Sequence, residues 1–269
     1  MEIKLSNVCF SYRGSRREVL NNISLTMPQN SICGLLGKNG VGKSTTLYLI
    51  AGLLRPKKGT VTIDGKQTMS GMPELLQDIF LVTEDFQMPN VTLSDYVRMN
   101  AVFYPRFSQE VLSDCLREFE MTDDVKLGEL SMGQKKKVLI SFALATQTRL
   151  LLMDEPTNGL DIPSKAQFRK AVSRGMTEER TIIISTHQVH DVEQLLDHIV
   201  IMSGNGILLD KSTQELQDEY VFEVRRPDDM DDAIYAEPSL QGNLVMAPRN
   251  GRQETNINLE LLFNAINKE

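Results

Sequence analysis

The glycine-rich segment GKNGVGKST, residues 37–45, constrains the fold of this chain more than any other feature. It fits the pattern GxxxxGK[ST], in which glycines let successive backbone N–H groups point at phosphate oxygens. An apolar run, residues 32–36, precedes it, and apolar residues at helical spacing follow it. The segment therefore predicts a buried strand, a phosphate-binding loop and a helix that ends at Pro56. A glycine-rich turn with a solvated lysine, the alternative, fits this context poorly.

Individual side chains of the loop have separate predicted roles. Lys43 is expected to neutralise the β- and γ-phosphates, and the Ser44 hydroxyl to ligate Mg²⁺. A second apolar run, residues 150–153, ends in Asp154 and Glu155, at the edge where ligands of open α/β sheets bind. Asp154 is predicted to hold Mg²⁺, directly or through water, and Glu155 to polarise an attacking water. Two strand-end carboxylates that face solvent are the alternative, which the phosphate loop disfavours.

The apolar pattern of the rest of the chain predicts the fold class. Residues 3–27 alternate as antiparallel strands around a polar turn, and Asp64-Gly65 closes a further strand at residues 60–63. Residues 86–128 show helical spacing and no obvious strand. We expect an α/β fold with a mostly parallel sheet core, an N-terminal antiparallel β part, a helical subdomain at about 86–145 and a small C-terminal appendage. The runs assigned to buried strands are residues 32–36, 79–83, 150–153, 182–184 and 199–202.

Composition narrows the class of protein. The chain has 269 residues, 41% of them hydrophobic, which excludes a mostly disordered chain. Its net charge of −7 argues against a general nucleic-acid binder. No apolar run approaches the roughly 20 residues of a membrane span, and the N-terminus lacks a signal-peptide core. Cys9, Cys33 and Cys115 are widely spaced and predict small buried side chains, so we expect a soluble protein of the cytosol.

The C-terminal part of the chain carries weaker signals. We expect the main domain at residues 1–215 and the appendage at residues 216–269, docked on the main domain because so short a segment is marginal alone. The local predictions are a hairpin turn at Gly204-Asn205-Gly206, a capping box formed by Ser212 and Glu215, a strand at residues 220–224 and a helix at residues 259–266.

A lysine-rich helix start lies about 20 residues before the acidic strand end. The segment LSMGQKKK, residues 130–137, begins with an N-cap candidate, Ser131, and continues into an apolar helix face. Three lysines in the first turn oppose the helix dipole, at a cost of about a few tenths of a kcal/mol each. Such a helix start is expected to face an anion, and a solvated lysine face is the alternative. The three residues are Lys135, Lys136 and Lys137.

LSMGQ resembles the signature motif of ABC-type ATPases, the nucleotide-binding subunits of ATP-binding-cassette transporters. The other family markers occur in the expected order over residues 1–215, including the Walker A loop, the Walker B strand LLLMDE, the D-loop PTNGLD and the switch segment STH. The resemblance implies a catalytic set of Glu155, His187 and Lys43, with Mg²⁺ held by Ser44, Asp154 and Glu84. The implied ATP-binding residues are Tyr12, which would stack on adenine, Gly37, Lys38, Asn39, Gly40, Val41, Gly42, Lys43, Ser44, Thr45, Ser131, Gly133, Gln134 and Asp161.

Two residues depart from the family pattern. Glu84 stands where the family has glutamine, and its carboxylate adds negative charge near the γ-phosphate. Met132 replaces a glycine of LSGGQ, but Ser131, Gly133 and Gln134 are kept and the backbone donors do not depend on that side chain.

Simpler structural interpretations exist for several of these residues. Tyr12 is alternatively a packed strand aromatic, and His187 a surface histidine after a strand. Asp161 also fits a helix N-cap before Ile162-Pro163, which is compatible with a dimer contact. His190 and His198 are expected to be structural or solvated.

The resemblance also implies partners. ATP and Mg²⁺ would bind between two ATPase chains, as a homodimer or a heterodimer, and a separate integral membrane permease would receive the motion. No nucleic acid is expected, and the chain would be cytoplasmic and peripheral on the inner face of the cell membrane. The alternative is a soluble ABC-type ATPase acting on ribosomes or DNA. The apolar candidates for permease contact, which helical spacing assigns equally to the core, are Phe86, Met88, Val91, Phe103, Tyr104 and Phe107.

Overall fold

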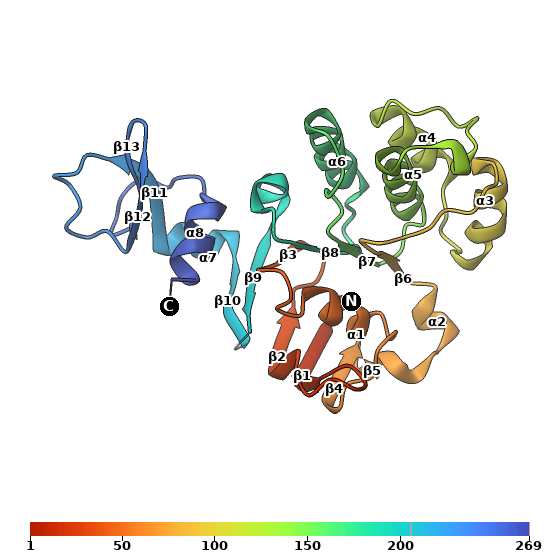
Figure 1. The fold of residues 1–269 in the computed structure, drawn as a ribbon, viewed down its shortest axis with the longest axis horizontal. Helices are drawn as coiled ribbons and strands as arrows, with labels where there is room; N and C mark the ends of the chain where they lie inside the picture. Colours follow the sequence, from red (N-terminus) through yellow and green to blue (C-terminus); the bar gives the residue numbers. More distant parts are fainter. Residues whose placement is uncertain (205, 269) are drawn as a thin grey trace.

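A mixed sheet forms the centre of the computed structural model, which describes residues 1–204 and 206–268 (Figure 1). Within those residues it has six strands in the order β10-β9-β3-β8-β7-β6. Neighbouring strands are parallel except β10, which pairs antiparallel with β9. The strands are β3 (Ile32–Gly37), β6 (Ile79–Val82), β7 (Leu150–Asp154), β8 (Thr181–Thr186), β9 (His198–Ser203) and β10 (Gly206–Ser212).

Both faces of this sheet are buried, as its uninterrupted apolar runs predict. On one face, Leu151 and Met153 pack in an apolar cluster with α5 (Met132–Ala145) and α6 (Ile162–Gly175). On the other face, Leu152 packs in a second cluster with α1 (Lys43–Ile50) and the N-terminal strands. The α/β prediction is confirmed. The carboxyl ends of β3, β7 and β8 lie at one edge, where the phosphate loop begins.

The N-terminal strands form an antiparallel sheet in the order β2-β1-β4-β5, as predicted. Asp64 and Gly65 have positive φ and turn β4 into β5, which confirms the predicted hairpin. Helix α1 ends at Ile50 rather than at Pro56, because Gly52 turns the chain with φ +73°, and a Cβ there would lie 2.6 Å from the Thr68 carbonyl. The strands are β1 (Ile3–Phe10), β2 (Leu20–Met27), β4 (Lys58–Ile63) and β5 (Lys66–Gln67), followed by η1 (Thr68–Ser70) and α2 (Pro73–Leu76).

Residues 86–128 contain two α-helices and two 3-10 turns joined by loops, with no strand, and they lie with α5 at one end of the molecule (Figure 1). Helices are what the spacing of this segment predicts. The rings of Tyr104 and Phe107 pack against Phe142 of α5, and Phe86, Met88 and Val91 also pack on apolar clusters. Of the six candidates for permease contact, Phe103 alone is strongly exposed, at 66%. The elements are α3 (Leu93–Asn100), η2 (Ala101–Phe103), α4 (Gln109–Glu118) and η3 (Leu127–Glu129).

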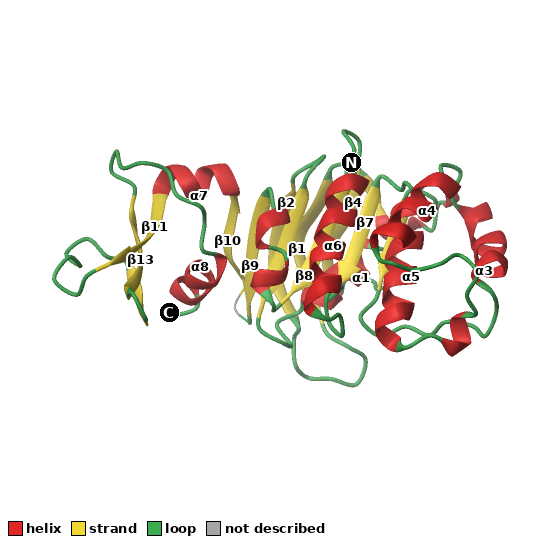
Figure 2. Cartoon of the chain, turned by 90° about the horizontal axis from the view of Figure 1, so that it is seen from above, coloured by secondary structure: helices red, strands yellow, loops and turns green. Residues whose placement is uncertain are grey.

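A C-terminal unit lies beyond β10 at the opposite end of the molecule (Figure 2). Its strand β11, its helix α8 and the capping box of α7 confirm the predictions for residues 212–266, whereas β12 and β13 were not predicted. The predicted turn at Gly204-Asn205-Gly206 includes residue 205, which lies outside the described residues. The elements are α7 (Thr213–Glu219), β11 (Tyr220–Arg225), β12 (Tyr235–Ser239), β13 (Gly242–Pro248) and α8 (Leu259–Ile266).

Helix α8 joins the C-terminal unit to the main sheet. Its Leu262 is fully buried in the same cluster as α5 and α6. Two short 3-10 turns, η4 (Val189–Asp191) and η5 (Glu193–Leu195), receive the helix. The Leu259 N–H donates to the Glu193 carboxylate at 2.6 Å, and Glu260 pairs with His190 at 2.5 Å. The histidine predicted to be structural or solvated therefore bonds to the C-terminal helix.

The cysteines, His198 and the apolar character of the helices each bear on a prediction made from the sequence. Cys33 and Cys115 are buried, whereas Cys9 is half-buried, and all three are free thiols. His198 bonds to Asp210 of the neighbouring strand at 2.6 Å. Over the part of the chain that the structure describes, no helix combines the length and the apolar character that crossing a membrane requires.

Candidate functional site

The phosphate loop joins β3 to α1 with the backbone geometry that its glycines allow. Gly42 precedes α1 with φ +109°, and an added Cβ there would lie 2.6 Å from Leu20 and 3.2 Å from the Val19 carbonyl. Gly40 has φ +79° and open space around it. Gly37 is tightly packed: a Cβ added there would lie 2.7 Å from the Met202 carbonyl oxygen. Glycine is therefore needed at Gly40 and Gly42 for a left-handed backbone conformation, and at Gly37 and Gly42 because neighbouring atoms leave no room for a side chain.

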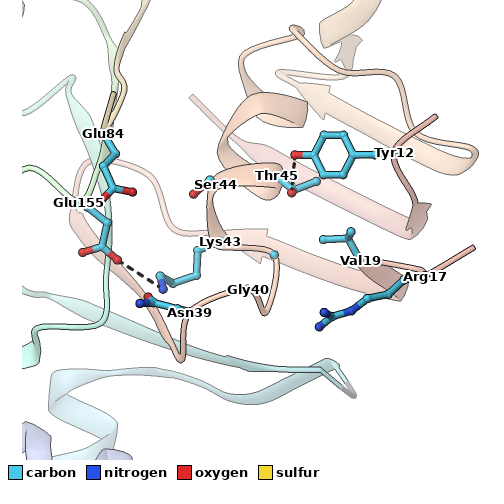
Figure 3. Close-up of a pocket in the computed structure, with 11 residues that line it drawn as sticks. Tyr12, Arg17, Val19, Asn39, Gly40, Lys43, Ser44, Thr45, Glu84 and Glu155 are labelled. Carbon is cyan, nitrogen blue, oxygen red and sulfur yellow. Dashed lines mark hydrogen bonds and ion pairs between the residues drawn. The ribbon is translucent and has the colours of Figure 1, made fainter. Parts of the chain in front are cut away.

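Lys43 is buried at the first turn of α1. Its ammonium donates to the carbonyl of Gly37 at 2.8 Å and to that of Lys38 at 3.4 Å. It also lies 3.4 Å from Glu155 Oε1, with both side chains only 5% exposed. Figure 3 shows this ion pair between the loop and the end of β7. The predicted cation of the loop is therefore held by main-chain oxygens and by one carboxylate.

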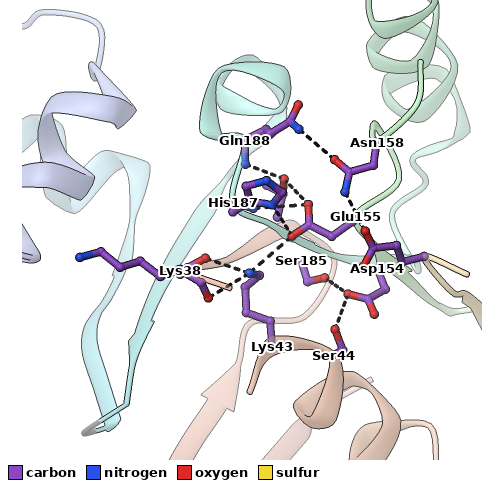
Figure 4. Close-up of polar contacts among 12 residues, drawn as sticks. Lys38, Lys43, Ser44, Asp154, Glu155, Asn158, Ser185, His187 and Gln188 are labelled. Atoms are coloured by element: carbon purple, nitrogen blue, oxygen red, sulfur yellow. Dashed lines mark hydrogen bonds and ion pairs between the residues drawn. The ribbon is translucent and has the colours of Figure 1, made fainter. Parts of the chain in front are cut away.

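Oxygen donors gather around Asp154 at the end of β7 (Figure 4). The Ser44 hydroxyl donates to Asp154 Oδ1 at 3.0 Å, and the Ser185 hydroxyl bonds to the same oxygen. The Tyr48 hydroxyl donates to Asp154 Oδ2 at 3.5 Å, and burial together with this carboxylate raises the pKa of Tyr48. A hydroxyl and a carboxylate side by side are the hard oxygen ligands that Mg²⁺ takes, together with waters and phosphate oxygens. The donor set fits the predicted ion.

Glu155 follows Asp154 in a left-handed backbone conformation, φ +45°, that directs its side chain toward the loop. The Thr186 hydroxyl donates to Oε2 at 3.0 Å, and His187 Nδ1 lies 2.8 Å from Oε1. The two residues predicted to be a base and a switch histidine are thus in direct contact. Thr186 was not predicted, although its place beside the STH histidine was visible in the sequence.

Among the described residues, no hydrogen bond joins Glu84 to Asp154. Its carboxylate accepts from the Asn158 amide at 2.9 Å, and Asn158 in turn accepts from the Gln188 amide at 3.0 Å. Glu84 therefore lies at the rim of the site and connects it to the turn after β7. Asn158 and Gln188 were missed, since nothing in the sequence relates positions 84, 158 and 188.

An open pocket of about 340 Å³ lies over the loop, within the range of small-molecule clefts. Tyr12 lies on the far side of the pocket from Glu84, with its hydroxyl 3.0 Å from Thr45 Oγ1 (Figure 3). The Tyr12 side chain is 44% exposed, and its ring is nearly perpendicular to that of Phe10, with the centroids 5.0 Å apart. Arg17 also lines the pocket and was not singled out, because it lies in a segment expected to be only a turn. The lining residues are Tyr12, Arg17, Val19, Asn39, Gly40, Gly42, Lys43, Ser44, Thr45, Glu84 and Glu155.

The signature segment lies at the start of α5 and contributes nothing to that lining. Ser131 and Gln134 form a reciprocal capping box, and the Cβ position of Gly133 is 3.2 Å from the Gly159 carbonyl. Met132 is 60% exposed. Asp161 caps α6 by accepting from the Ser164 N–H at 2.9 Å, and bonds from Ser164 lower the pKa of Asp161. The structure thus separates Ser131, Gly133, Gln134 and Asp161 from the loop within one chain.

The three lysines of the α5 start do not form one anion-facing patch or one solvated face. Lys136 is 5% exposed and donates to the carbonyls of Glu155 and Asn158. Lys137 turns toward the Phe119 carbonyl and Gln167. For Lys136 and Lys137, both predictions, an anion-facing helix start and a solvated lysine face, are wrong. The reason is tertiary packing: α5 packs against α6 and against the turn after β7 (residues 155–158), and these neighbours supply carbonyl and amide acceptors.

Comparison with known proteins identifies the family. A family model for ABC transporters matches residues 20–158. The chain is 30% identical over 220 residues to the ABC transporter ATP-binding protein NatA of Bacillus subtilis, covering 79% of this chain and 87% of NatA. It is 31% identical over 214 residues to the bacitracin transport ATP-binding protein BcrA of Bacillus licheniformis, covering 77% of this chain and 68% of BcrA.

Solved structures show the same fold. An ATP-binding subunit of an ABC transporter superposes with a TM-score of 0.72 and 24% identity, over 81% of this chain and 92% of that chain. A dimeric ATP-binding cassette in a post-hydrolysis state with ADP and Pi gives a TM-score of 0.68 and 24% identity, over 78% of this chain and 98% of that chain. From its motifs, its site and these relatives, the chain belongs to the family of ABC transporter ATP-binding proteins and is an ATPase.

Proposed function

We propose that the chain hydrolyses MgATP at the loop pocket, as one of two ATPase chains that drive a separate membrane permease. The observation that carries the proposal is the contact of Glu155 with Lys43, Thr186 and His187 at the end of β7. A carboxylate held by three donors beside a phosphate loop has a fixed orientation and can accept a proton from water. ATP and water would yield ADP and phosphate, without a covalent intermediate on the protein.

The loop residues would bind and orient the phosphates. Backbone N–H groups of residues 39–45 and the α1 dipole would attract the phosphate oxygens, and Lys43 would exchange its bond with Glu155 for the β- and γ-phosphates. Ser44 and Asp154 would hold Mg²⁺, which neutralises phosphate charge when bound. Glu84 would reach that ion or the attacking water from the rim. His187 would donate to the γ-phosphate while it orients Glu155.

Tyr12 would stack on the adenine. Its ring is 44% exposed on the pocket side opposite Glu84, and the Thr45 hydroxyl and Phe10 restrict its orientation. An aromatic ring that is half-exposed and fixed loses little conformational freedom when a base stacks on it. Arg17, at the same side of the pocket, would add a positive charge near the nucleotide.

A second chain would complete the site. The capping box of Ser131 and Gln134 uses the N–H groups of those two residues at a helix start outside the pocket lining. The next N–H groups of that helix start, those of Met132 and Gly133, would bind a phosphate held by another chain. Gly133 and Asp161 would lie at the same interface. The dimeric cassette among the similar structures supports this arrangement. The second chain would be another copy of this one or a sister subunit.

A permease would receive the motion at the face that bears Glu84 and the helical subdomain. Phe103, with Val102 beside it, is the exposed apolar candidate there. The relatives support a transport role: their names include bacitracin transport and, for ZurA of Listeria innocua at 30% identity, zinc uptake. The chain would then sit at the inner face of the cell membrane.

Affinity purification of the chain from detergent-solubilised native membranes tests the coupling. A polytopic membrane protein recovered in stoichiometric amount supports the proposal and identifies the permease. Ribosomal proteins or DNA in place of a membrane protein would support the alternative, an ABC-type ATPase that acts on ribosomes or DNA. Peripheral membrane association in cell fractions is the simpler first readout.

A further inference from the structure

Lys136 is a buried cation that the proposed reaction does not use. It lies in the first turns of α5, 5% exposed. Its ammonium donates to two main-chain carbonyls, those of Glu155 at 3.1 Å and Asn158 at 2.9 Å. Burying an ammonium is costly unless strong acceptors or charges surround it. Burial lowers the pKa of Lys136, whereas the charges of Glu84, Glu155 and Asp154 raise it.

The two carbonyls belong to one tight turn. The Asn158 N–H donates to the Glu155 carbonyl at 3.2 Å, so the turn spans residues 155–158. Lys136 adds a second donor to the Glu155 carbonyl and a donor to the Asn158 carbonyl. It therefore ties the first and last residues of the turn to the signature helix.

The turn sets the direction of the Glu155 side chain. Glu155 has φ +45°, a conformation that a residue with a Cβ adopts at a cost of about 1 kcal/mol or more and keeps only where its surroundings hold it. With the carbonyl fixed by Lys136, the side chain points the other way, to Lys43 and His187. Loss of the ammonium would leave the peptide after Glu155 free to rotate.

The same ammonium offsets the charge of Glu84. The Glu84 carboxylate bonds to the Asn158 side chain, and Lys136 bonds to the Asn158 carbonyl, so one residue separates the two charges. Glu84 is the residue that departs from the uncharged glutamine of the family. Asp154, Glu155 and Glu84 are three carboxylates at the side of the pocket where the γ-phosphate is expected, and all three act on the charge of Lys136.

We propose that Lys136 is a positioning residue for hydrolysis, which holds the 155–158 turn so that Glu155 faces the pocket and which balances the negative charge of Glu84. The inference rests on the proposed role of Glu155 as the base. Through Lys136, helix α5, which begins with the signature segment, contacts the 155–158 turn of its own chain. This contact is separate from the one that α5 would make with the nucleotide bound by a second chain.

Steady-state ATPase kinetics of the full-length Lys136→Met chain test the proposal. The apolar side chain fills a similar space, but it removes the donor to two main-chain carbonyls, which lowers stability because buried acceptors lose a partner. We expect the melting temperature to fall by a few degrees to about ten degrees, with the chain still folded at assay temperature. We expect kcat to fall by about 10- to 100-fold, because a misplaced catalytic group costs about that much. KM and the Kd for ATP should change by less than about threefold, since Lys136 does not line the pocket.

Matched variants separate positioning from structure. Lys136→Arg keeps a cation and several donors, so it should recover most of kcat. Lys137→Met removes the neighbouring lysine, whose partners are Phe119 and Gln167, and should leave kcat within about twofold. In the Glu84→Gln background the loss caused by Lys136→Met should shrink by at least about threefold, because one carboxylate fewer needs balancing.

Several outcomes would overturn the inference. A Lys136→Met chain with unchanged kcat, or one whose activity falls only in proportion to its folded fraction, shows that the lysine is merely structural. If Lys136→Met lowers kcat by the same factor in the unaltered chain and in the Glu84→Gln chain, Lys136 does not balance the charge of Glu84. If Glu155→Gln keeps full turnover, the proposed base itself is wrong. If Glu155→Gln is inactive while Lys136→Met is fully active, this inference alone fails.

Discussion

The Lys43 ammonium and the Glu155 carboxylate form an ion pair inside the candidate site, with Nζ 3.4 Å from Oε1. Both side chains are 5% exposed, so solvent and salt screen the pair weakly. The ammonium is also the group expected to contact the β- and γ-phosphates. In the proposed reaction, Glu155 would therefore compete with the phosphates of ATP for Lys43 before it acts on water.

Removing that competition should tighten nucleotide binding. We expect Glu155→Gln to lower the Kd for ATP by about three- to tenfold, up to about 1.4 kcal/mol, while turnover is lost. Calorimetric titration at low chain concentration measures the affinity. Glu84→Gln is the matched control, because it removes one carboxylate of the pocket that bonds to Asn158 rather than to Lys43. Weaker ATP binding by Glu155→Gln than by the unaltered chain would contradict the competition.

The backbone at Gly42 tolerates no side chain. A Cβ there would meet Leu20 at 2.6 Å, and φ is +109°. We expect Gly42→Ala to destabilise the chain by about 1–3 kcal/mol and to abolish ATP binding, because the loop cannot keep its shape. Gly204→Ala, at a turn with no atom near the Cβ position, should change stability by less than about 0.5 kcal/mol. Chemical denaturation with nucleotide titration checks both, and a Gly42→Ala chain that binds ATP normally refutes the expectation.

Two capping boxes of the same type allow the signature helix to be tested separately. Ser131 with Gln134 caps α5, and Ser212 with Glu215 caps α7. Ser131→Ala and Ser212→Ala should each cost about 1 kcal/mol, the usual loss of an N-cap. In the Glu155→Gln background, only Ser131→Ala should weaken ATP-dependent association, measured by sedimentation. An equal effect of both substitutions would mean that only helix stability matters.

The C-terminal unit should unfold together with the main domain. Leu262 of α8 is fully buried in the cluster that includes α5 and α6, so Leu262→Ala is expected to cost about 2–5 kcal/mol. Leu240, in the turn between β12 and β13, is fully exposed, and Leu240→Ala should be neutral. Thermal unfolding should show one shifted transition. Two separate transitions would instead support an independent appendage at residues 216–269.

An acid-dependent contribution to stability is expected in the C-terminal unit. Hydrogen bonds from Arg225 and Arg252, each 2.5 Å, hold the pKa of Asp232 at about 2, below its ordinary 3.8. Because the folded pKa is the lower one, the contribution is complete above about pH 5 and is lost progressively as the pH falls through 2 to about 1. Asp232→Asn should therefore destabilise the unit at pH 6, and the difference from the unaltered chain should shrink steadily as the pH falls to about 1. A difference that grows on acidification would contradict the assignment.

Local patterns were enough to predict the elements that frame the site. Residues 32–45 and 150–155 are apolar runs that end in a glycine-rich segment or in acids, and the roles predicted for them follow from the chemistry of phosphate and Mg²⁺. Helix α8 and the Ser212 capping box were likewise encoded by short-range spacing. In contrast, β12 was missed because its sequence, YAEPS, contains a proline and no apolar alternation, and its pairing with β13 supplies the order.

The contacts that orient Glu155 could not be read from the sequence. Glu84 and Asn158 are 74 positions apart, and Lys136 lies 19 positions before Glu155. Three consecutive lysines indicate only a charged helix start. Which lysine turns inward depends on how α5 packs against the turn after β7, because that turn supplies the carbonyl acceptors. The end of α1 at Ile50 also depends on a tertiary contact, that of Gly52 with Thr68.

The mass of the Glu155→Gln chain in solution, measured by light scattering with and without MgATP, tests most directly whether a second copy of the chain completes the site. One chain has a mass of 30.3 kDa. With ATP bound and not hydrolysed, the mass should double, and Ser131→Ala should oppose the doubling. A chain that is saturated with ATP by calorimetry, yet stays at the mass of one chain, would contradict the completion of the site by a second copy.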